Sequence, residues 1–279
     1  MTSPVSVTIA GPASDGFTRS QHAVWASLPV SLTEAPAKAR LIAVDGRSAG
    51  WLETLENAIR PGTAGVLVVR PAPGPSAHDI RSAAAAAASA GTIVAVQTTW
   101  AANPAVAPFA RAAAERLSDI TLIDSVAQLD DTHSQWADVL LDHLSLLRAV
   151  IGPLDLTRFA AQHEHGYTVD AAVGTSAVAM SAVRSAAPPQ AARLAAHSAT
   201  AEAHLIVPSG DTATPATTWF VDSAGAAVQP TWYETASRAS WRRLRDAAER
   251  PGESLPDLSN LADDAEMLTG ITAVWHGGK

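Results

Sequence analysis

Strand and helix signals alternate through the first 117 residues, and this alternation restricts the possible folds more than any other feature of the sequence. Short runs of β-branched and apolar residues predict strands, and they lie at residues 5–10, 40–45, 65–69 and 92–96. The segments between and after them predict helices at residues 14–28, 51–59, 77–90 and 104–117. Strands that alternate with helices form a parallel sheet with right-handed crossovers. The N-terminal part is therefore expected to be a small, doubly wound, Rossmann-like α/β domain.

The pattern changes near residue 118. Residues 120–128 predict a strand, and residues 136–151 predict a strongly amphipathic helix. The next part has strand-like runs with turns between them, which favours an antiparallel sheet. These runs lie at residues 156–163, 177–183, 191–198, 203–207, 217–221 and 227–232, and helices at 233–250 and 258–274 close the chain. We therefore expect two domains, an α/β domain at residues 1–118 and an α+β domain with a mainly antiparallel sheet at residues 119–279.

Composition excludes several classes of function. The 279 residues carry a formal net charge of −8, whereas binding to nucleic acid needs a basic surface. An acidic surface has no attraction for anionic membranes either. Without cysteine, the chain has no disulfides, thiolate metal sites or cysteine nucleophiles. The N-terminus does not resemble a signal peptide, and the alanine run at residues 83–88 is too short to span a bilayer. We expect a cytoplasmic protein without nucleic-acid or membrane partners.

The first predicted strand leads into a glycine-containing turn at residues 11–16 (GPASDG). Against the dinucleotide-binding pattern G-x-G-x-x-G, Gly11 and Gly16 match, and Ala13 replaces the middle glycine. The glycines of this pattern let backbone N–H groups approach a pyrophosphate at a helix N-terminus. Here Ala13 adds a methyl group, and Asp15 adds a carboxylate beside the place of the phosphates. Two interpretations stay open: Gly11, Ala13 and Gly16 bind NAD or NADP, or they form a plain strand-to-helix turn.

Asp45 ends the second predicted strand. In dinucleotide-binding folds an acidic residue at this place binds the ribose hydroxyls. Asp45 lies 29 residues after Gly16, however, whereas the usual spacing is about 20 residues. Asp45 is therefore a candidate cofactor-binding residue, with an ordinary turn before Gly46 as the alternative.

Three candidate catalytic residues lie on the helix predicted at residues 136–151. Asp138 and Asp142 are four residues apart and share a face, where two like charges slightly destabilise a helix. The pair marks either a site or a solvated face. His143 lies on the apolar stripe of the same helix, so a hydrogen-bonded core histidine is the alternative to a catalytic one.

Other chemistry-bearing residues give weaker signals. His163 and His165 flank Glu164 in a predicted strand, with both rings on one side, but no third ligand is close in sequence and no metal site is predicted. The P-loop and the H-E-x-x-H pattern are missing from the sequence. Among eight tryptophans, Trp219 and Trp232 lie on predicted strands of the second domain and are candidates for a subunit contact.

Several stretches together resemble one enzyme family. They are residues 7–16, residues 66–71 with His78, Asn103-Pro104, the helix positions Asp138, Arg148 and Gly152, and the closing helix at residues 258–271. In this order they resemble the Gfo/Idh/MocA group, the relatives of glucose–fructose oxidoreductase and inositol dehydrogenase. The resemblance implies a Rossmann domain that binds NAD or NADP. It also implies a C-terminal α+β domain with flanking helices and an open sheet, which binds substrate on one side and packs against another subunit on the other.

The departures from the family's motifs concern its chemistry. Thr98 stands where the family's Glu-Lys-Pro has the lysine that contacts substrate and nicotinamide, and the helix–strand unit that follows is missing. Asp142 stands for the catalytic histidine, and His143 comes one residue late, which is about 100° around a helix. Leu140, Ser145 and Ala101 replace a glycine, an aspartate and an arginine of the motifs. Without a placed proton acceptor, oxidation of an alcohol loses a factor of about 10² to 10⁴.

Three hypotheses about function follow. The first is a protein that has lost dehydrogenase chemistry and serves as a non-catalytic or regulatory subunit, in a homo- or hetero-oligomer formed through the C-terminal sheet. The second is an active NAD(P)-dependent oxidoreductase for a sugar or polyol-like substrate, with Asp142 or His143 as base. The third is a small-molecule binding protein that uses the cleft between its domains. The first is favoured because the middle glycine, the lysine and the histidine are lost together while the scaffold pattern persists.

Overall fold

The computed structural model describes residues 4–28, 31–117, 119–129, 135–186, 190–208, 214–250 and 252–277. Contacts divide the chain into two compact units, Met1–Thr98 with Ala236–Ala265, and Thr99–Thr235 with Glu266–Lys279. Residue 118, the expected boundary, lies outside the described residues, and the compact units divide between Thr98 and Thr99. None of the described helices is long and apolar enough to cross a bilayer.

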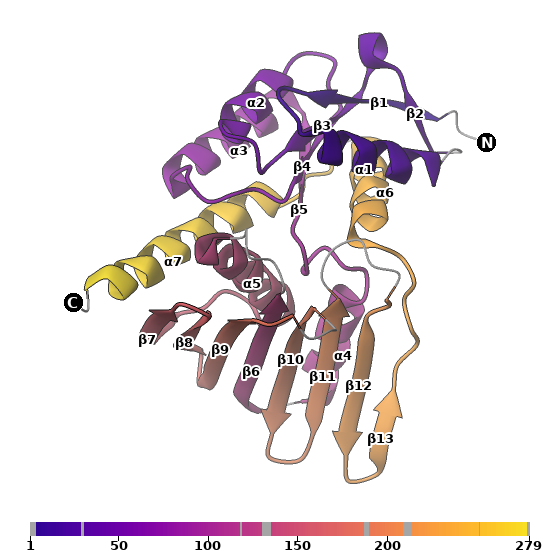
Figure 1. Cartoon of the computed structure of the whole chain (residues 1–279). Coiled ribbons are helices and arrows are strands. Elements are labelled where there is room, and N and C mark those ends of the chain that lie inside the picture. Colours follow the sequence, from indigo (N-terminus) through magenta and orange to yellow (C-terminus); the bar gives the residue numbers. More distant parts are fainter. Residues whose placement is uncertain are drawn as a thin grey trace. The chain divides into compact units, whose positions relative to one another are not determined.

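The first unit contains a parallel sheet, sheet A, with the strand order β2-β1-β3-β4-β5 (Figure 1). Its strands are β1 (Val5–Ala10), β2 (Leu32–Glu34), β3 (Leu41–Asp45), β4 (Gly65–Val69) and β5 (Ile93–Gln97). All residues of β3 and β4 are buried, which explains why these strands are apolar apart from Asp45 at the end of β3. The predicted Rossmann-like α/β architecture is confirmed.

Helices cover both faces of sheet A. They are α1 (Asp15–Ala26), α2 (Trp51–Ala58), α3 (Ala77–Ala90), α6 (Ala236–Ala248) and the first part of α7 (Asp257–Gly277). Figure 1 shows α1 and α6 on one face and α2 and α3 on the other. The helix ends follow from local chemistry. The hydroxyls of Ser14 and Ser76 accept hydrogen bonds from the first turns of α1 and α3, and Gly91 ends α3 in a left-handed conformation.

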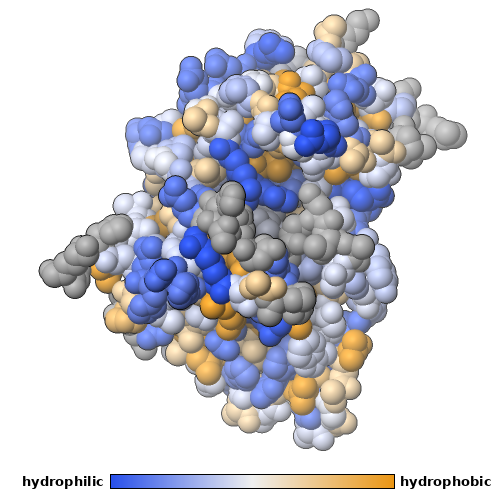
Figure 2. All heavy atoms as spheres, in the orientation of Figure 1, coloured by the Kyte–Doolittle hydropathy of each residue, from blue (hydrophilic) through white to orange (hydrophobic). Residues whose placement is uncertain are grey.

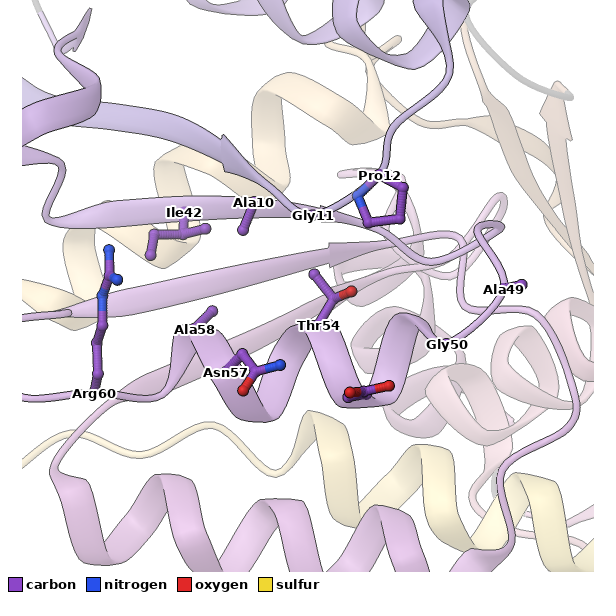
Figure 3. Close-up of a pocket in the computed structure, with 11 residues that line it drawn as sticks. Ala10, Gly11, Pro12, Ile42, Ala49, Gly50, Thr54, Asn57, Ala58 and Arg60 are labelled. Atoms are coloured by element: carbon purple, nitrogen blue, oxygen red, sulfur yellow. The ribbon is translucent and has the colours of Figure 1, made fainter.

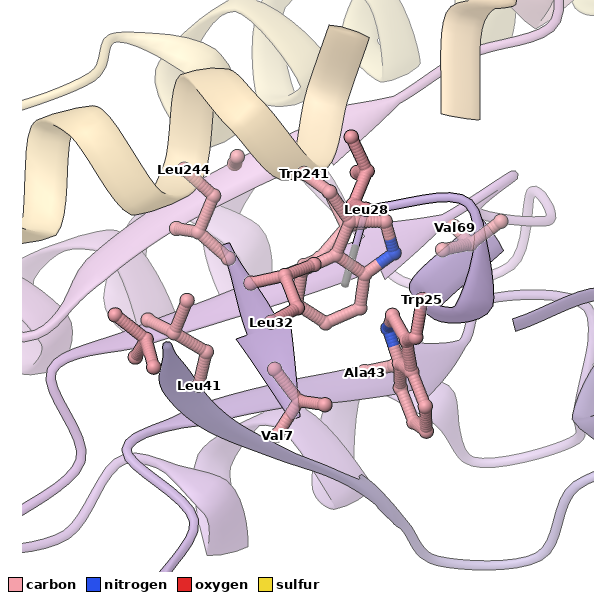
Figure 4. Close-up of a cluster of buried hydrophobic side chains, with 12 residues drawn as sticks. Val7, Trp25, Leu28, Leu32, Leu41, Ala43, Val69, Trp241 and Leu244 are labelled. Carbon is pink, nitrogen blue, oxygen red and sulfur yellow. The ribbon is translucent and has the colours of Figure 1, made fainter. Parts of the chain in front are cut away.

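The core of the first unit lies between sheet A and the helices α1 and α6 (Figure 4). Trp241 of α6 meets Trp25 of α1 edge to face, with ring centroids 5.6 Å apart. The indole N–H of Trp241 donates to the buried Gln21 side chain at 2.9 Å. A Cβ on Gly65 would lie 2.7 Å from Cδ1 of Leu244, so the glycine at the start of β4 admits this leucine against the sheet.

Strand β2 was missed in the sequence, and its presence changes two predictions. Asp45 ends the third strand, β3, and not the second. The connection from β2 to β3 contains only a 3₁₀ turn, Pro36–Lys38. The observed order is that of the dinucleotide-binding fold, 3-2-1-4-5-6, without its outermost strand. The missing helix–strand unit therefore belongs between β2 and β3, and its predicted place after Thr98 was wrong.

The second unit is built on a sheet of eight strands, sheet B, in the order β13-β12-β11-β10-β6-β9-β8-β7. Only the β6–β9 pair is parallel among these neighbours. The predicted mainly antiparallel sheet is therefore confirmed. The strands are β6 (Ile120–Leu129), β7 (Leu156–His163), β8 (Gly166–Val173), β9 (Ser176–Arg184), β10 (Ala191–Ser198), β11 (Glu202–Pro208), β12 (Thr217–Asp222) and β13 (Gly225–Val228).

Helices α4 (Val106–Arg116) and α5 (Trp136–Ile151) lie on the same face of sheet B (Figure 1). Along β6 the side chains of Ile123, Ser125 and Ala127 are buried, whereas those of the alternate residues Leu122 and Asp124 are exposed. This alternation leaves the second face of the sheet accessible along β6. We call it the open face of sheet B.

Two strand predictions in this unit were wrong. Strand β8 is missing from the predicted strands, and the structure shows that Gly166 begins it after a tight turn. The last strand ends at Val228 and not at residue 232. Pro230 has no N–H to continue the ladder, and Trp232 makes only an isolated bridge with Ala216.

Candidate functional site

The turn between β1 and α1 is the candidate cofactor site of the first unit. Gly11 has a φ of +69°, which favours glycine, and a Cβ there would lie 2.5 Å from Cγ2 of Thr54 in α2. Ser14 caps α1, since its hydroxyl accepts the N–H of Phe17 at 3.1 Å. The first glycine is thus required by the backbone and by the close approach of α2.

The other two positions of the glycine motif are not required in this way. A Cβ on Gly16 would meet only Oγ of Ser14, at 4.0 Å. In dinucleotide-binding turns the third glycine permits close packing of helix on strand, and no such packing constrains Gly16. Ala13 carries a side chain where the second glycine lets the backbone approach the pyrophosphate.

Asp45 is bound to this turn from the end of β3. It is 7% exposed. One of its carboxylate oxygens accepts the N–H of Ser14 at 3.4 Å, and the other accepts the N–H of Arg47 at 3.1 Å. Backbone N–H groups at the start of a helix are the donors that bind a phosphate. The carboxylate of Asp45 already uses one of them, so the turn does not fit a pyrophosphate in the usual way.

Glu34, at the end of β2, was missed in the sequence. It lies 18 residues after Gly16, close to the spacing of about 20 expected for the acid that binds ribose. In the structure its carboxylate lies 3.4 Å from Nε2 of His22, and both side chains are about half exposed. The spacing between Gly16 and Glu34 is the signal in the sequence for this role. It is recognised only when β2 is known to be a strand that ends at Glu34.

Arg70-Pro71, directly after β4, was also missed. Arg70 has a φ of +53°. Among the described residues, no other non-glycine residue has a positive φ. Its N–H still donates to the carbonyl of Gln97, at 2.7 Å. A bulky residue in this conformation is strained, and such strain clusters at functional sites. Arg70-Pro71 also resembles the last two residues of the family's Glu-Lys-Pro, because a basic residue is followed by proline. Thr98, the position predicted for the lysine, does not have this pattern.

Asp142, in the second unit, is held by Thr99. One carboxylate oxygen accepts the N–H of Thr99 at 3.0 Å, and the other accepts its hydroxyl in a short hydrogen bond. Asp142 therefore fastens the segment after β5 to α5. Asp138 lies in the first turn of α5, where a carboxylate complements the positive end of the helix dipole.

His143 lies in the core of the second unit, fully buried. Its Nε2 is 2.6 Å from the hydroxyl of Ser125 on β6, and its Nδ1 is 2.9 Å from the hydroxyl of Tyr167 on β8. Trp100 meets the ring edge to face. Burial lowers the pKa of His143 from 6.5 to about 3 and, with the charge of Asp142, raises the pKa of Tyr167 well above its usual value. The imidazole is thus neutral, with both nitrogens in hydrogen bonds.

The remaining candidates are not brought together. His163 ends β7 and His165 lies in the turn before β8, so the two rings do not share one strand as predicted. Within the described residues, no group of three or more histidine, aspartate or glutamate residues is arranged to hold a metal ion. The cofactor candidates belong to the first unit, and Asp138, Asp142 and His143 belong to the second.

Comparisons with known proteins show which solved structures have a similar fold. The sequence matches no known family model and no curated protein sequence. The structure is similar to KijD10, a 3-ketoreductase from Actinomadura kijaniata in complex with TDP-benzene and NADP, with a TM-score of 0.74, 12% identity and 98% of each chain covered. It is similar to GnnA, a UDP-N-acetylglucosamine 3-dehydrogenase from Acidithiobacillus ferrooxidans, with a TM-score of 0.75, 9% identity and 99% of each chain covered.

A further similar structure is MviM, a dehydrogenase from Clostridium difficile, with a TM-score of 0.69 and 7% identity. It covers 96% of this chain and 99% of its own. Identities this low establish similarity of fold and leave activity to the residues of the site. The chain has the fold of the Gfo/Idh/MocA-type oxidoreductases.

Proposed function

We propose that the chain is a non-catalytic protein with an oxidoreductase fold, a subunit without dehydrogenase chemistry. The burial and pKa of His143, together with the hydrogen bonds of Asp142, are the main support for this proposal. A general acid–base group must reach the proton that it transfers and have a pKa near the working pH. His143 is sealed in the core with a pKa of about 3, and both carboxylate oxygens of Asp142 accept hydrogen bonds from Thr99.

The β1–α1 turn supports the same proposal. A dinucleotide would bring its negatively charged pyrophosphate to a turn that already has the carboxylates of Asp15 and Asp45. Like charges disfavour each other at this range, and one backbone donor is already used by Asp45. We infer that NAD and NADP bind weakly or not at all.

Thermal unfolding with saturating NAD, NADH, NADP or NADPH tests this proposal. Binding at about 100 times the dissociation constant would stabilise the folded state by about 2.7 kcal/mol. We expect no shift of the melting temperature for the wild type. An Asp45→Ser variant, which removes the carboxylate and keeps a hydrogen-bonding group, is the matched comparison. A shift of several degrees in the wild type, with oxidation of NADPH in the presence of a keto sugar, would contradict the proposal.

One observation favours a second candidate function, an active NAD(P)-dependent oxidoreductase. Glu34 lies where an acid would bind the ribose of NAD, and the similar ketoreductase KijD10 is in complex with NADP. In such an enzyme Arg70 would stand for the lysine of Glu-Lys-Pro. The same thermal measurement with NAD, repeated on Glu34→Gln, separates this candidate from the first.

The open face of sheet B is the surface that we propose for a partner subunit. Leu122 and Val183 are 39% and 40% exposed on it. Trp219 stacks on His204, whose Nε2 is 3.0 Å from Glu202. Figure 2 shows hydrophobic residues scattered among hydrophilic ones in this part of the molecule. Such a mixed composition agrees with a subunit interface, because whole interfaces are about as apolar as the rest of a protein surface.

Sedimentation measurements test the partner surface. We expect the wild type to associate with a second copy and Val183→Arg to abolish that association, because a buried, unpaired charge is costly at an interface. Val274→Arg is the matched control, since Val274 is also exposed, at 50%, but lies on α7. Monomeric wild-type protein, or equal association of both variants, would overturn this assignment.

A further inference from the structure

A pocket of about 440 Å³ lies on the side of sheet A that faces α2 (Figure 3). This volume is within the range of small-molecule sites. Residues of three segments line it, the end of β1 with the following turn, the middle of β3, and α2 with its flanks. They are Ala10, Gly11, Pro12, Ile42, Ala49, Gly50, Glu53, Thr54, Asn57, Ala58 and Arg60.

The shortened topology explains why the pocket is open. A parallel crossover normally has a dozen or more residues and a helix, and here residues 35–40 join β2 to β3 with a single 3₁₀ turn. Alternate residues of β1 point away from the core around Trp241, and these are Ser6, Thr8 and Ala10, all partly exposed. Polar and small side chains on this face suit a solvated groove and not a protein contact.

One stripe of α2 supplies the polar wall. Asn57 comes four residues after Glu53 and three after Thr54, so its side chain shares a helix face with both. Figure 3 shows Thr54 and Ala58 directed from α2 toward the strands, with Arg60 beyond the end of the helix near Ile42. The floor beneath them is apolar, formed by Ala10, Ile42 and Ala58.

The charges of the pocket are separated along its length. Arg60 lies at the end near Ile42, whereas Glu53 lies in the first turn of α2, whose N-cap is Gly50. Within the described part of the chain, the side chains of Glu53, Asn57 and Arg60 take part in no hydrogen bond or ion pair. A guanidinium binds a phosphate or carboxylate with two parallel hydrogen bonds. A carboxylate accepts hydrogen bonds from hydroxyl groups, and an amide both donates and accepts.

We propose that this pocket binds a small sugar or polyol with a terminal anionic group, either phosphate or carboxylate. The anion pairs with Arg60, and the hydroxyls bind Asn57, Thr54 and Glu53. The carbon skeleton lies against Ala10, Ile42 and Ala58. The site uses side chains of α2 and not the N–H groups at the start of α1, so it does not depend on the proposed loss of dehydrogenase chemistry.

Titration calorimetry with glucose 6-phosphate, glucuronate, glucose and inorganic phosphate tests the proposal. We expect at least one of the two anionic sugars to bind about tenfold or more tightly than either glucose or phosphate, since a charge-assisted hydrogen bond contributes that much. Whichever anionic sugar binds identifies the anion. Equal binding of phosphate alone, or no binding of either anionic sugar, overturns the proposal.

Single-residue variants test whether the anionic sugar binds in this pocket. Arg60→Ala should reduce binding of the anionic sugar to the level of glucose, and Asn57→Asp should weaken it by repulsion. Arg111→Ala, at an exposed arginine of α4, is the matched control and should bind as the wild type does. Melting temperatures equal to that of the wild type show that each variant is folded. Unchanged binding by Arg60→Ala, or displacement of the sugar by NADP, would overturn the assignment.

Discussion

Replacing Trp241 with alanine is expected to destabilise the first unit by about 3–5 kcal/mol. Trp241 is fully buried between α1 and sheet A, and it packs against Trp25. Its removal also leaves the side chain of Gln21, 1% exposed, without its hydrogen-bond donor. Urea unfolding monitored by circular dichroism measures the effect.

Trp232→Ala provides the comparison. Trp232 is 43% exposed, and substitutions at such positions change stability by about 0.5 kcal/mol. If Trp241→Ala cost no more than Trp232→Ala, α6 would not be part of the core of the first unit. That result would contradict the grouping of Ala236–Ala265 with the N-terminal sheet.

Lowering the pH from 7 to 5 is expected to cost the second unit about 2 kcal/mol of unfolding free energy through His143 alone. Burial lowers the pKa of His143 in the folded state to about 3, whereas its model value is 6.5. As the pH falls, the unfolded chain therefore takes up the proton first. The contribution of the neutral ring is fully present above pH 6.5 and is lost as the pH falls toward 3.

Urea unfolding at several pH values measures this dependence, with His143→Gln and His165→Gln compared with the wild type. His143→Gln should reduce the slope by about 1.4 kcal/mol per pH unit between these limits. His165→Gln, at a side chain that is 78% exposed, is the control variant. A ring resonance of His143 that titrates near 6.5 would show a solvent-accessible imidazole and would reopen an acid–base role.

Much of the fold could be predicted because local signals and tertiary packing agree. The run at β4 is apolar over its whole length, β3 is apolar up to its last residue, β1 is rich in β-branched residues, and Gly91 marks the end of α3. Strand β2 has only three residues, with one apolar side chain, so neither periodicity nor composition distinguishes it from a loop. Its pairing with β1 comes from tertiary structure, and this is why Asp45 was assigned to the wrong strand.

The candidate site was harder to predict than the fold. The helix pattern correctly identified His143 on the apolar stripe, and the core alternative stated for it describes its observed surroundings. Its partners Ser125 and Tyr167 come from β6 and β8, and no sequence spacing indicates that these strands lie on either side of one helical residue. The same limit applies to Asp142, whose contact with Thr99 joins residues 43 positions apart.

The division of the chain into units has a consequence for synthesis on the ribosome. The first unit needs Ala236–Ala265 in addition to Met1–Thr98, and chains emerge from the N-terminus at about 5–20 residues per second. Trp241 and Leu244 pack on one face of sheet A. They are synthesised only after the strands of sheet B, so until then this face lacks its contacts with α6. The half of the protein that is synthesised first is the half that is completed late, so an uncovered apolar sheet persists in the nascent chain and is exposed to chaperones or to aggregation.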